Sequence, residues 1–130
     1  ITIDFVTSNG LHLGGYIVSG ITGLSQTIKS STGLNFDHST ANLSDSIPTN
    51  TNDALTLGGW MMVSGFFKKI EETIARNEVF QSSSNDLVWV LTGGDHEKVR
   101  NFLRSPSLLN TQLVLEGAVI VSKDLTEPHD

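Results

Sequence analysis

Gly14-Gly15-Tyr16-Ile17-Val18-Ser19-Gly20 is the stretch that decides the fold, because it joins a predicted β-hairpin to a predicted helix. Glycine lacks a Cβ and accepts a positive φ, so the backbone can approach a ligand closely at this junction. A helix that begins after Gly20 would direct its unpaired N–H groups and the positive end of its dipole to the same place, which favours an anion. A plain tight turn has the same pattern.

The hairpin before this junction is predicted from residues that alternate between two faces. Residues 1–6 alternate with β-branched side chains, which predicts a strand. The dipeptide Asn9-Gly10 favours a hairpin turn, so residues 12–18 should return antiparallel to the first strand. Asp4 falls on the face opposite the apolar residues, where its carboxylate would face either solvent or a site.

A short helix and a long polar segment should follow. Apolar residues spaced three and four apart predict a helix over residues 20–30. Residues 30–50 are rich in Ser, Thr, Asn and Asp, which predicts a loop. His38 lies beside Asp37 in that loop and could titrate near neutral pH.

A long helix is predicted over residues 51–77, with Asn50 or Thr51 as its cap. It would span roughly 37 Å, more than the short strands need. Three glycines weaken it and suggest close packing against another element or a subunit, so we expect a homodimer through this helix. Alternatively, its large side chains only cover the sheet. The glycines are Gly58, Gly59 and Gly65, and the predicted buried stripe is Leu55, Met62, Phe66, Ile70 and Ile74.

A second glycine-containing bend follows a predicted buried strand at residues 87–91, which is a continuous apolar run. The strand ends at Thr92, Gly93 and Gly94. Ligands of open α/β sheets bind beyond the carboxyl ends of the strands, so these glycines could leave the backbone bare for a flat ring or a phosphate. A plain strand-to-helix turn is the alternative.

The rest of the chain should alternate between helix and strand. Asp95 and His96 are expected as the N-terminal pair of a helix that runs to about residue 103. A short strand at Leu113-Val114 and a helix over residues 115–123 should follow. The side chains expected to be buried in that last helix are Ala118, Val119 and either Val121 or Ile120.

Composition limits the class of protein. The 130 residues fit one domain, and 38% hydrophobic with 17% charged residues is typical of a globular chain. A net charge of −6 with scattered cations excludes a broad basic surface for nucleic acid. The absence of cysteine excludes disulfides and thiolate metal sites. No apolar run approaches the ~18 residues of a membrane span, and no signal-peptide pattern is present, so we expect a cytoplasmic protein without membrane contact.

Four segments in order carry a resemblance to a known family. They are Thr2-Ile3-Asp4 with Val6, residues 13–20, residues 47–54 with Gly58, and residues 91–94 with Leu115-Glu116-Gly117 downstream. Together they resemble the second, C-terminal domain of type III pantothenate kinase, of the actin, sugar kinase and Hsp70-like superfamily. The resemblance implies an α/β, ribonuclease H-like or actin-like ATPase domain. Its mixed sheet would start with an antiparallel hairpin and carry helices on both faces, in the order β-β-α-α-β-α-β-α.

The resemblance also implies a reaction, the transfer of the γ-phosphoryl group of ATP to the 4′-hydroxyl of pantothenate. This is the first step of coenzyme A biosynthesis, and the family works as dimers with Mg²⁺ and a monovalent cation, K⁺ or NH₄⁺. By position, Gly14, Gly15 and Gly20 would line the pantothenate and phosphate side, Thr51 would reach pantothenate near the dimer interface, and Thr92, Gly93 and Gly94 would border the nucleotide.

The chain also departs from the family pattern. Ser19 stands where the family has Pro, and Pro48 stands where it has Gly. The D-x-G-T-A run expected before Ile1 is absent, as is the first domain with its phosphate loop and catalytic base. We therefore expect no catalytic residue within residues 1–130 and no activity from them alone. The alternatives are a non-catalytic accessory or regulatory relative, another kinase or phosphatase of the superfamily, and an interaction domain whose glycine turns bind nothing.

Overall fold

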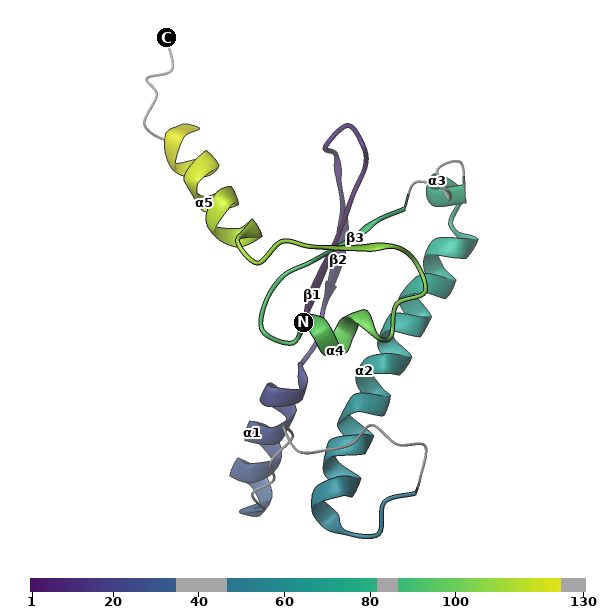
Figure 1. The fold of residues 1–130 in the computed structure, drawn as a ribbon, viewed down its shortest axis with the longest axis vertical. Helices are drawn as coiled ribbons and strands as arrows, with labels where there is room; N and C mark the ends of the chain where they lie inside the picture. Colours follow the sequence, from purple (N-terminus) through teal and green to yellow (C-terminus); the bar gives the residue numbers. More distant parts are fainter. Residues whose placement is uncertain (35–46, 82–86, 125–130) are drawn as a thin grey trace. The chain divides into compact units, whose positions relative to one another are not determined.

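Helices and strands both occur in the computed structural model, which describes residues 1–34, 47–81 and 87–124 (Figure 1). The predicted α/β class is therefore confirmed. His38 and most of the predicted loop over residues 30–50 lie outside the described residues. The elements in chain order are β1 (Thr2–Val6), β2 (His12–Ile17), α1 (Ile21–Thr32), α2 (Thr51–Arg76), α3 (Glu78–Gln81), β3 (Trp89–Leu91), α4 (His96–Arg100), β4 (Ser107–Leu109) and α5 (Leu113–Asp124).

The chain divides into two compact units, residues 1–65 and residues 66–130, and each is described by itself. Helix α2 begins in the first unit and ends in the second. The element order agrees with the predicted order, with the one-turn helix α3 added after α2. The sequence predicts a single mixed sheet, whereas the described strands form two separate two-stranded sheets, β1-β2 and β3-β4.

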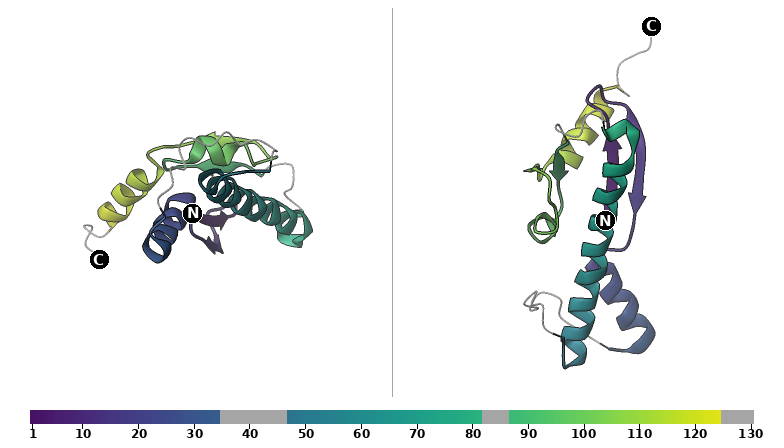
Figure 2. Two further views of the ribbon diagram at one scale, coloured as in Figure 1. Left: turned by 90° about the horizontal axis from the view of Figure 1, so that it is seen from below. Right: turned by 90° about the vertical axis from the view of Figure 1, so that its right-hand side faces the viewer.

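The hairpin of the first unit confirms the predicted strands. β1 and β2 run antiparallel, as the opposed arrows in the right-hand view of Figure 2 show. Phe5 pairs with Gly14 and Val6 pairs with His12, so Leu13 is one residue too many on its strand. Such an extra residue is a β-bulge, which bends the strand and increases its local twist. Gly14 has φ 108°, a conformation that residues with a side chain rarely adopt.

Helix α1 packs against the first part of α2 through a glycine. Ile21 is 1% exposed and begins α1. A Cβ added to Gly59 would overlap the Cδ1 atom of Ile21, so a larger residue here would require the Ile21 side chain to move. Gly58 and Gly65 would meet nothing within 4 Å. The prediction of close packing at the helix glycines is therefore confirmed for Gly59 against α1, and the other two glycines face open space.

The buried stripe of α2 differs from the predicted one. Ile70 and Ile74 are buried as predicted, but Met62 is 49% exposed and Leu55 and Phe66 are half-buried. At about 100° per residue, the observed stripe is rotated by roughly 70° from the predicted one. The side chains of the observed stripe are Thr56, Trp60, Val63, Phe67, Ile70 and Ile74.

The second unit contains a β-α-β arrangement. β3 and β4 are parallel, with Trp89 opposite Ser107 and Leu91 opposite Leu109, and α4 lies between them in the chain. The rings of Phe67 and Trp89 meet edge to face with centroids 5.8 Å apart. The carboxylate of Glu71 on α2 accepts the backbone N–H of Arg104 at 2.7 Å, which fixes the segment before β4 to the helix. The buried apolar side chains of this unit are Phe67, Ile70, Ile74, Leu91 and Val99.

The prediction of a strand at Leu113-Val114 is wrong. The strand lies earlier, at β4, and Leu113 is already the first residue of α5. Asn110 is responsible for the early helix start. Its side-chain oxygen accepts the N–H of Gln112 at 2.9 Å, and its side-chain amide donates to Glu116 at 2.8 Å. These bonds hold the turn that leads directly into α5.

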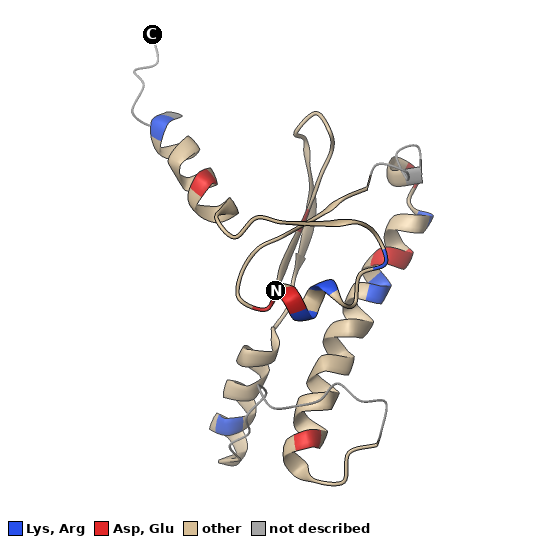
Figure 3. Ribbon diagram, viewed as in Figure 1, with Lys and Arg blue, Asp and Glu red and all other residues tan. Residues whose placement is uncertain are grey.

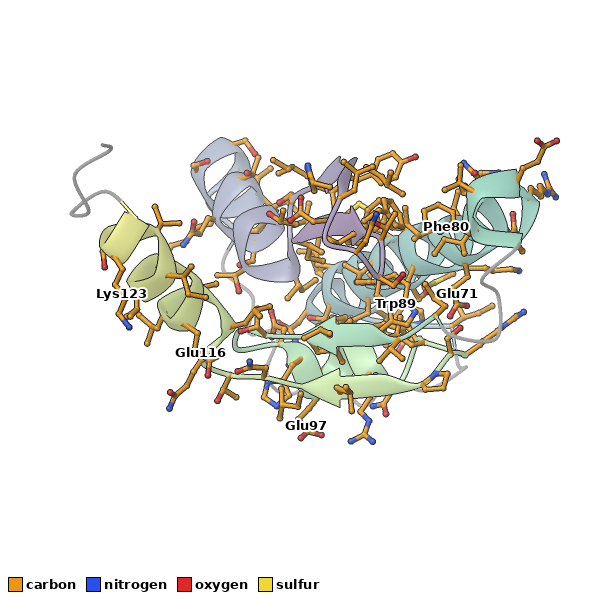
Figure 4. All side chains as sticks on the ribbon, turned by 90° about the horizontal axis from the view of Figure 1, so that it is seen from above. Glu71, Phe80, Trp89, Glu97, Glu116 and Lys123 are labelled. Carbon is orange, nitrogen blue, oxygen red and sulfur yellow. The ribbon has the colours of Figure 1, made fainter. Side chains whose placement is uncertain are left out.

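The prediction of buried side chains in α5 is also wrong. Val119, Ile120 and Val121 are 52%, 62% and 57% exposed, and Ala118 is exposed as well. Aliphatic residues occur on nearly every side of this helix, so its sequence offers no single inward stripe. Glu116 in its first turn and Lys123 in its last turn, both labelled in Figure 4, suit the helix dipole.

Candidate functional site

The hairpin itself requires the two glycines at positions 14 and 15. Gly14 has φ 108° at the bulge, and a Cβ at that position would meet nothing within 4 Å. Gly15 pairs with Asp4, and a Cβ on Gly15 would overlap the carbonyl oxygen of Ile3 on the neighbouring strand. A ligand is thus not needed to explain either glycine, and the binding role predicted for them stays a prediction.

Gly20 is the N-cap residue of α1 and leaves the helix end open. Its φ of −82° and ψ of 176° are extended, and no side chain caps the helix. The first helical bond runs from the N–H of Leu24 to the carbonyl of Gly20, so the N–H groups of residues 21–23 have no acceptor within the helix. The Ser19 hydroxyl donates to the Gly20 carbonyl at 3.1 Å. This helix end has the donors that an anion needs, as predicted from the sequence.

Asp4 contacts His12 on the hairpin surface. Its carboxylate lies 3.0 Å from Nε2 of His12, and the two side chains are 56% and 59% exposed. Of the two alternatives for Asp4, the structure supports the solvent-facing one within the first unit. An exposed pair of this kind contributes little to stability because water and salt screen it.

Thr51 is free of the capping role because Asn50 performs it. The side-chain oxygen of Asn50 accepts the N–H of Asp53 at 2.9 Å, and its amide donates to the Asp53 carboxylate at 2.7 Å. Thr51 is the exposed first residue of α2, and its hydroxyl makes no hydrogen bond to a described residue. The hydroxyl is therefore available to a ligand, which agrees with the predicted contact to pantothenate but does not test it.

The bend from Thr92 to Gly94 is exposed and open. Gly93 has φ 89°, and a Cβ at either glycine would meet nothing within 4 Å. His96, which the sequence suggests only as part of a helix N-terminus, folds back so that its Nδ1 lies 2.8 Å from the Gly93 carbonyl oxygen. No sequence signal indicates this contact, because it depends on the positive φ of Gly93.

The predicted site residues fall into two groups. Gly14, Gly15, Gly20 and Thr51 belong to the first unit, and the bend at residues 92–94 belongs to the second. A kinase would need both groups at one cleft, and we predict that they meet there in the whole protein. A surface hollow of about 280 Å³ along the end of α2 contains none of them; it is lined by Lys69, Glu72, Thr73, Arg76 and Asn77.

Charged side chains are sparse around the first group. From Ala54 to Phe67, α2 carries no charged residue, whereas both signs mix on the end of α2 and on α4 (Figure 3). Within the described ranges no His, Asp and Glu side chains gather in a group of three that could hold a metal ion. No helix of the described part is both long enough and apolar enough to cross a membrane.

Comparison with known proteins identifies relatives along almost the whole chain. A type III pantothenate kinase from Marinomonas sp. is 30% identical over 125 residues, which are 95% of this chain and 47% of that protein. Another, from Campylobacter hominis, is 34% identical over 128 residues, covering 95% of this chain and 53% of that protein. The chain therefore spans about half the length of these curated relatives.

A solved structure agrees in fold. It is the crystal structure of a conserved protein from Campylobacter jejuni that has been suggested to be a Baf family transcriptional activator. The match has a TM-score of 0.59 and 27% sequence identity, and it covers 95% of this chain and 52% of that one. The family model described as type III pantothenate kinase matches residues 1–76, more than half of the chain. The predicted resemblance is thereby confirmed, and the chain belongs to the type III pantothenate kinase family.

Proposed function

We propose that residues 1–130 are the C-terminal half of an ATP-dependent pantothenate kinase. The whole protein would transfer the γ-phosphoryl group of ATP to the 4′-hydroxyl of pantothenate, the first step of coenzyme A biosynthesis, and would act in the cytoplasm. The observation that carries this proposal is the family match over residues 1–76, together with relatives named type III pantothenate kinase along 95% of the chain.

The proposal includes the finer fold, an actin-like ATPase domain completed by a first domain and by a strand with D-x-G-T. Each described sheet has only two strands. An isolated two-stranded sheet is marginally stable in water, so further strands from the rest of the protein would stabilise both. The first domain would also supply the catalytic base.

The chain's own residues would act by binding and orienting the two substrates. The open helix end at Gly20, beside Gly14 and Gly15 in sequence, would hold the phosphate side. The Thr51 hydroxyl would bind pantothenate. The bend of Thr92, Gly93 and Gly94 would border the nucleotide, since its backbone is exposed. Phosphoryl transfer depends mostly on positioning and on charge stabilisation, and these groups can provide the positioning.

Mg²⁺ and a monovalent cation, K⁺ or NH₄⁺, belong to the same proposal. Proteins hold Mg²⁺ largely through substrate phosphates, waters and one or two carboxylates. Because the described residues contain no cluster of three candidate ligands, the phosphates of ATP and the other half of the protein would supply most of its coordination. Bound there, Mg²⁺ would offset the charge that develops on the transferred group.

A homodimer through the helix at residues 51–77 is also proposed. Met61 and Met62 are 73% and 49% exposed, and the glycines at 58 and 65 face open space on the same uncharged part of α2. Exposed apolar side chains of this kind are common at protein interfaces. The mass of the full-length protein by sedimentation should be that of a dimer, and Met61→Glu should shift it to a monomer.

An accessory or regulatory relative is the second candidate function. The Campylobacter jejuni protein with the matching fold has been suggested to be a transcriptional activator, which favours this candidate. Such a relative would bind ATP without phosphorylating pantothenate. Another kinase of the superfamily would turn over ATP with a different alcohol, because a fold does not decide the substrate.

The decisive experiment measures ADP release by the full-length protein, with ATP, Mg²⁺ and K⁺, in the presence and absence of pantothenate. We expect release that depends on pantothenate, with 4′-phosphopantothenate identified by mass spectrometry. ATP binding without release would support the accessory role, and release with other alcohols only would support a different kinase. Residues 1–130 alone should show no turnover. Robust turnover by them would refute the proposal that catalysis needs the first domain.

A further inference from the structure

His96 makes one well-defined contact with the bend that precedes α4. Its Nδ1 atom lies 2.8 Å from the carbonyl oxygen of Gly93. A carbonyl oxygen can only accept a hydrogen bond, so Nδ1 carries a proton and donates it. The other ring nitrogen, Nε2, lies 3.5 Å from the carboxylate of Glu97, whose side chain is 77% exposed and points outward in Figure 4. The His96 side chain is 21% exposed, so the bend and α4 largely enclose it.

The hydrogen bond from His96 also restrains the N–H of the next residue, Gly94. A trans peptide is planar, and its C=O and N–H point in opposite directions. The carbonyl of Gly93 and the N–H of Gly94 belong to one peptide group, and the structure has no cis peptide bond. By holding the carbonyl, His96 therefore sets the direction of the Gly94 N–H.

The peptide needs such a restraint because it joins two glycines. Glycine populates positive and negative φ almost equally, so a Gly-Gly peptide can rotate between orientations at little cost. In the structure Gly93 has φ 89°, so the peptide has the orientation that goes with a positive φ. The hydrogen bond from His96 favours that orientation over the flipped one, in which the ring would face an N–H group.

The Gly94 N–H that results is unoccupied and accessible. It makes no hydrogen bond to a described residue, and the residue is exposed. A Cβ at Gly94 would meet nothing within 4 Å, so the space beside its Cα atom is open. An exposed donor with a fixed direction can bind an acceptor atom of a ligand.

We propose that His96 is a positioning residue that holds the Gly93–Gly94 peptide so that the Gly94 N–H can donate to an acceptor atom of the bound nucleotide. The acceptor would be an oxygen or a ring nitrogen, the two kinds of acceptor that a nucleotide offers. This inference rests on the proposed function and adds a residue to its nucleotide side. His96 touches no reacting atom, so it acts on nucleotide affinity and not on the chemical step.

Three variants of the full-length protein separate this role from plain structural support. His96→Asn keeps a donor at the place of Nδ1, because both nitrogens are bonded to Cγ. His96→Gln places its donor one bond further out, near the position of Nε2. His96→Ala removes both nitrogens.

We expect His96→Ala and His96→Gln to raise the KM for ATP about tenfold, and His96→Asn to stay within about twofold of the wild type. The KM for pantothenate and kcat should change little in all three variants. Equal KM shifts for both substrates, no shift in His96→Ala, or equal losses in His96→Asn and His96→Ala would overturn the inference.

A second measurement does not depend on turnover. In the ¹H–¹⁵N spectrum of the full-length protein, ATP should shift the Gly94 amide resonance in the wild type and in His96→Asn, and much less in His96→Ala. If ATP does not shift the Gly94 resonance of the wild type, the inference is overturned, even if the protein is an active kinase. A protein that binds ATP at Gly94 but never phosphorylates pantothenate refutes the kinase proposal and leaves the role of His96 supported.

Discussion

The Cα atom of Gly59 in α2 lies so close to the side chain of Ile21 in α1 that a Cβ at position 59 would overlap the Ile21 methyl group. The two helices of the first unit thus meet at a position where a side chain at residue 59 would displace that of Ile21. Gly58, the preceding residue, faces open space. The two neighbouring glycines provide a matched pair for measuring what this contact contributes.

Gly59→Ala should destabilise the full-length protein by about 1–3 kcal/mol, because the added methyl group overpacks the helix contact. Gly58→Ala should stabilise it by about 1 kcal/mol, because alanine favours a helix and meets no neighbour there. Denaturant unfolding followed by circular dichroism measures both changes. Free energies of unfolding that change in the same direction would contradict the packing described here.

The start of α2 allows folding and binding to be separated. Asn50→Ala should lower the free energy of unfolding by about 1 kcal/mol, because the N–H of Asp53 loses its acceptor, and Asn50→Asp should retain most of the stability. Thr51→Ala should leave stability nearly unchanged and raise the KM for pantothenate more than that for ATP. Thermal unfolding and steady-state kinetics of the full-length protein measure these effects. Equal changes in both KM values would count against the placement of Thr51.

The bond from Arg104 N–H to Glu71 should contribute measurably to the second unit. Glu71→Ala should cost about 1 kcal/mol, because the backbone donor loses its partner, whereas Glu71→Gln keeps an oxygen acceptor and most of the stability. Glu72→Ala is the control, since Glu72 makes only a surface pair with Lys69 at 3.7 Å, a kind of pair worth at most about 1 kcal/mol. A loss in Glu72→Ala as large as that in Glu71→Ala would argue against the assigned role.

Gly93 and Gly94 should differ in their tolerance of a side chain. Gly93→Ala should destabilise the protein by about 1–2 kcal/mol, because a residue with a Cβ is strained at φ 89°. Gly94→Ala should change the free energy of unfolding little, because its φ is not positive and its surroundings are open. Unfolding of the two variants under the same conditions provides the comparison, and equal losses would show that the bend has another conformation in solution.

The early part of the fold could be predicted because local signals and tertiary packing agree there. The Asn9-Gly10 turn and the alternation around it give β1 and β2 almost to the residue. The polar cap of α2 at Asn50 likewise fixes where that helix begins. Its buried face was predicted only in part, because Met62 is exposed whereas Thr56, Trp60 and Val63 on the adjacent side of the helix are buried. Apolar residues occur on both sides of α2, so their spacing alone does not decide which side faces inward.

The later part of the fold was harder to predict, because short elements have too few residues for a clear sequence pattern. β4 has three residues, too few for a period to be recognised. Leu113-Val114-Leu115 has a composition typical of a strand, but the side-chain bonds of Asn110 start a helix there. The uncapped helix end at Gly20 and the exposed bend after β3 agree with the local structure predicted there, while their binding roles stay predictions. The contribution of His96 was missed because its contact depends on the conformation of Gly93, which the sequence does not reveal.

The glycine at position 15 affects how sequences of this family should be compared. The residue is irreplaceable because the Ile3 carbonyl oxygen occupies the place of its side chain. Evolution would therefore retain glycine at this position even in a descendant that had lost every substrate. A glycine at this position therefore indicates an intact hairpin and not an active enzyme. Other positions, such as Thr51, should distinguish active enzymes from inactive relatives.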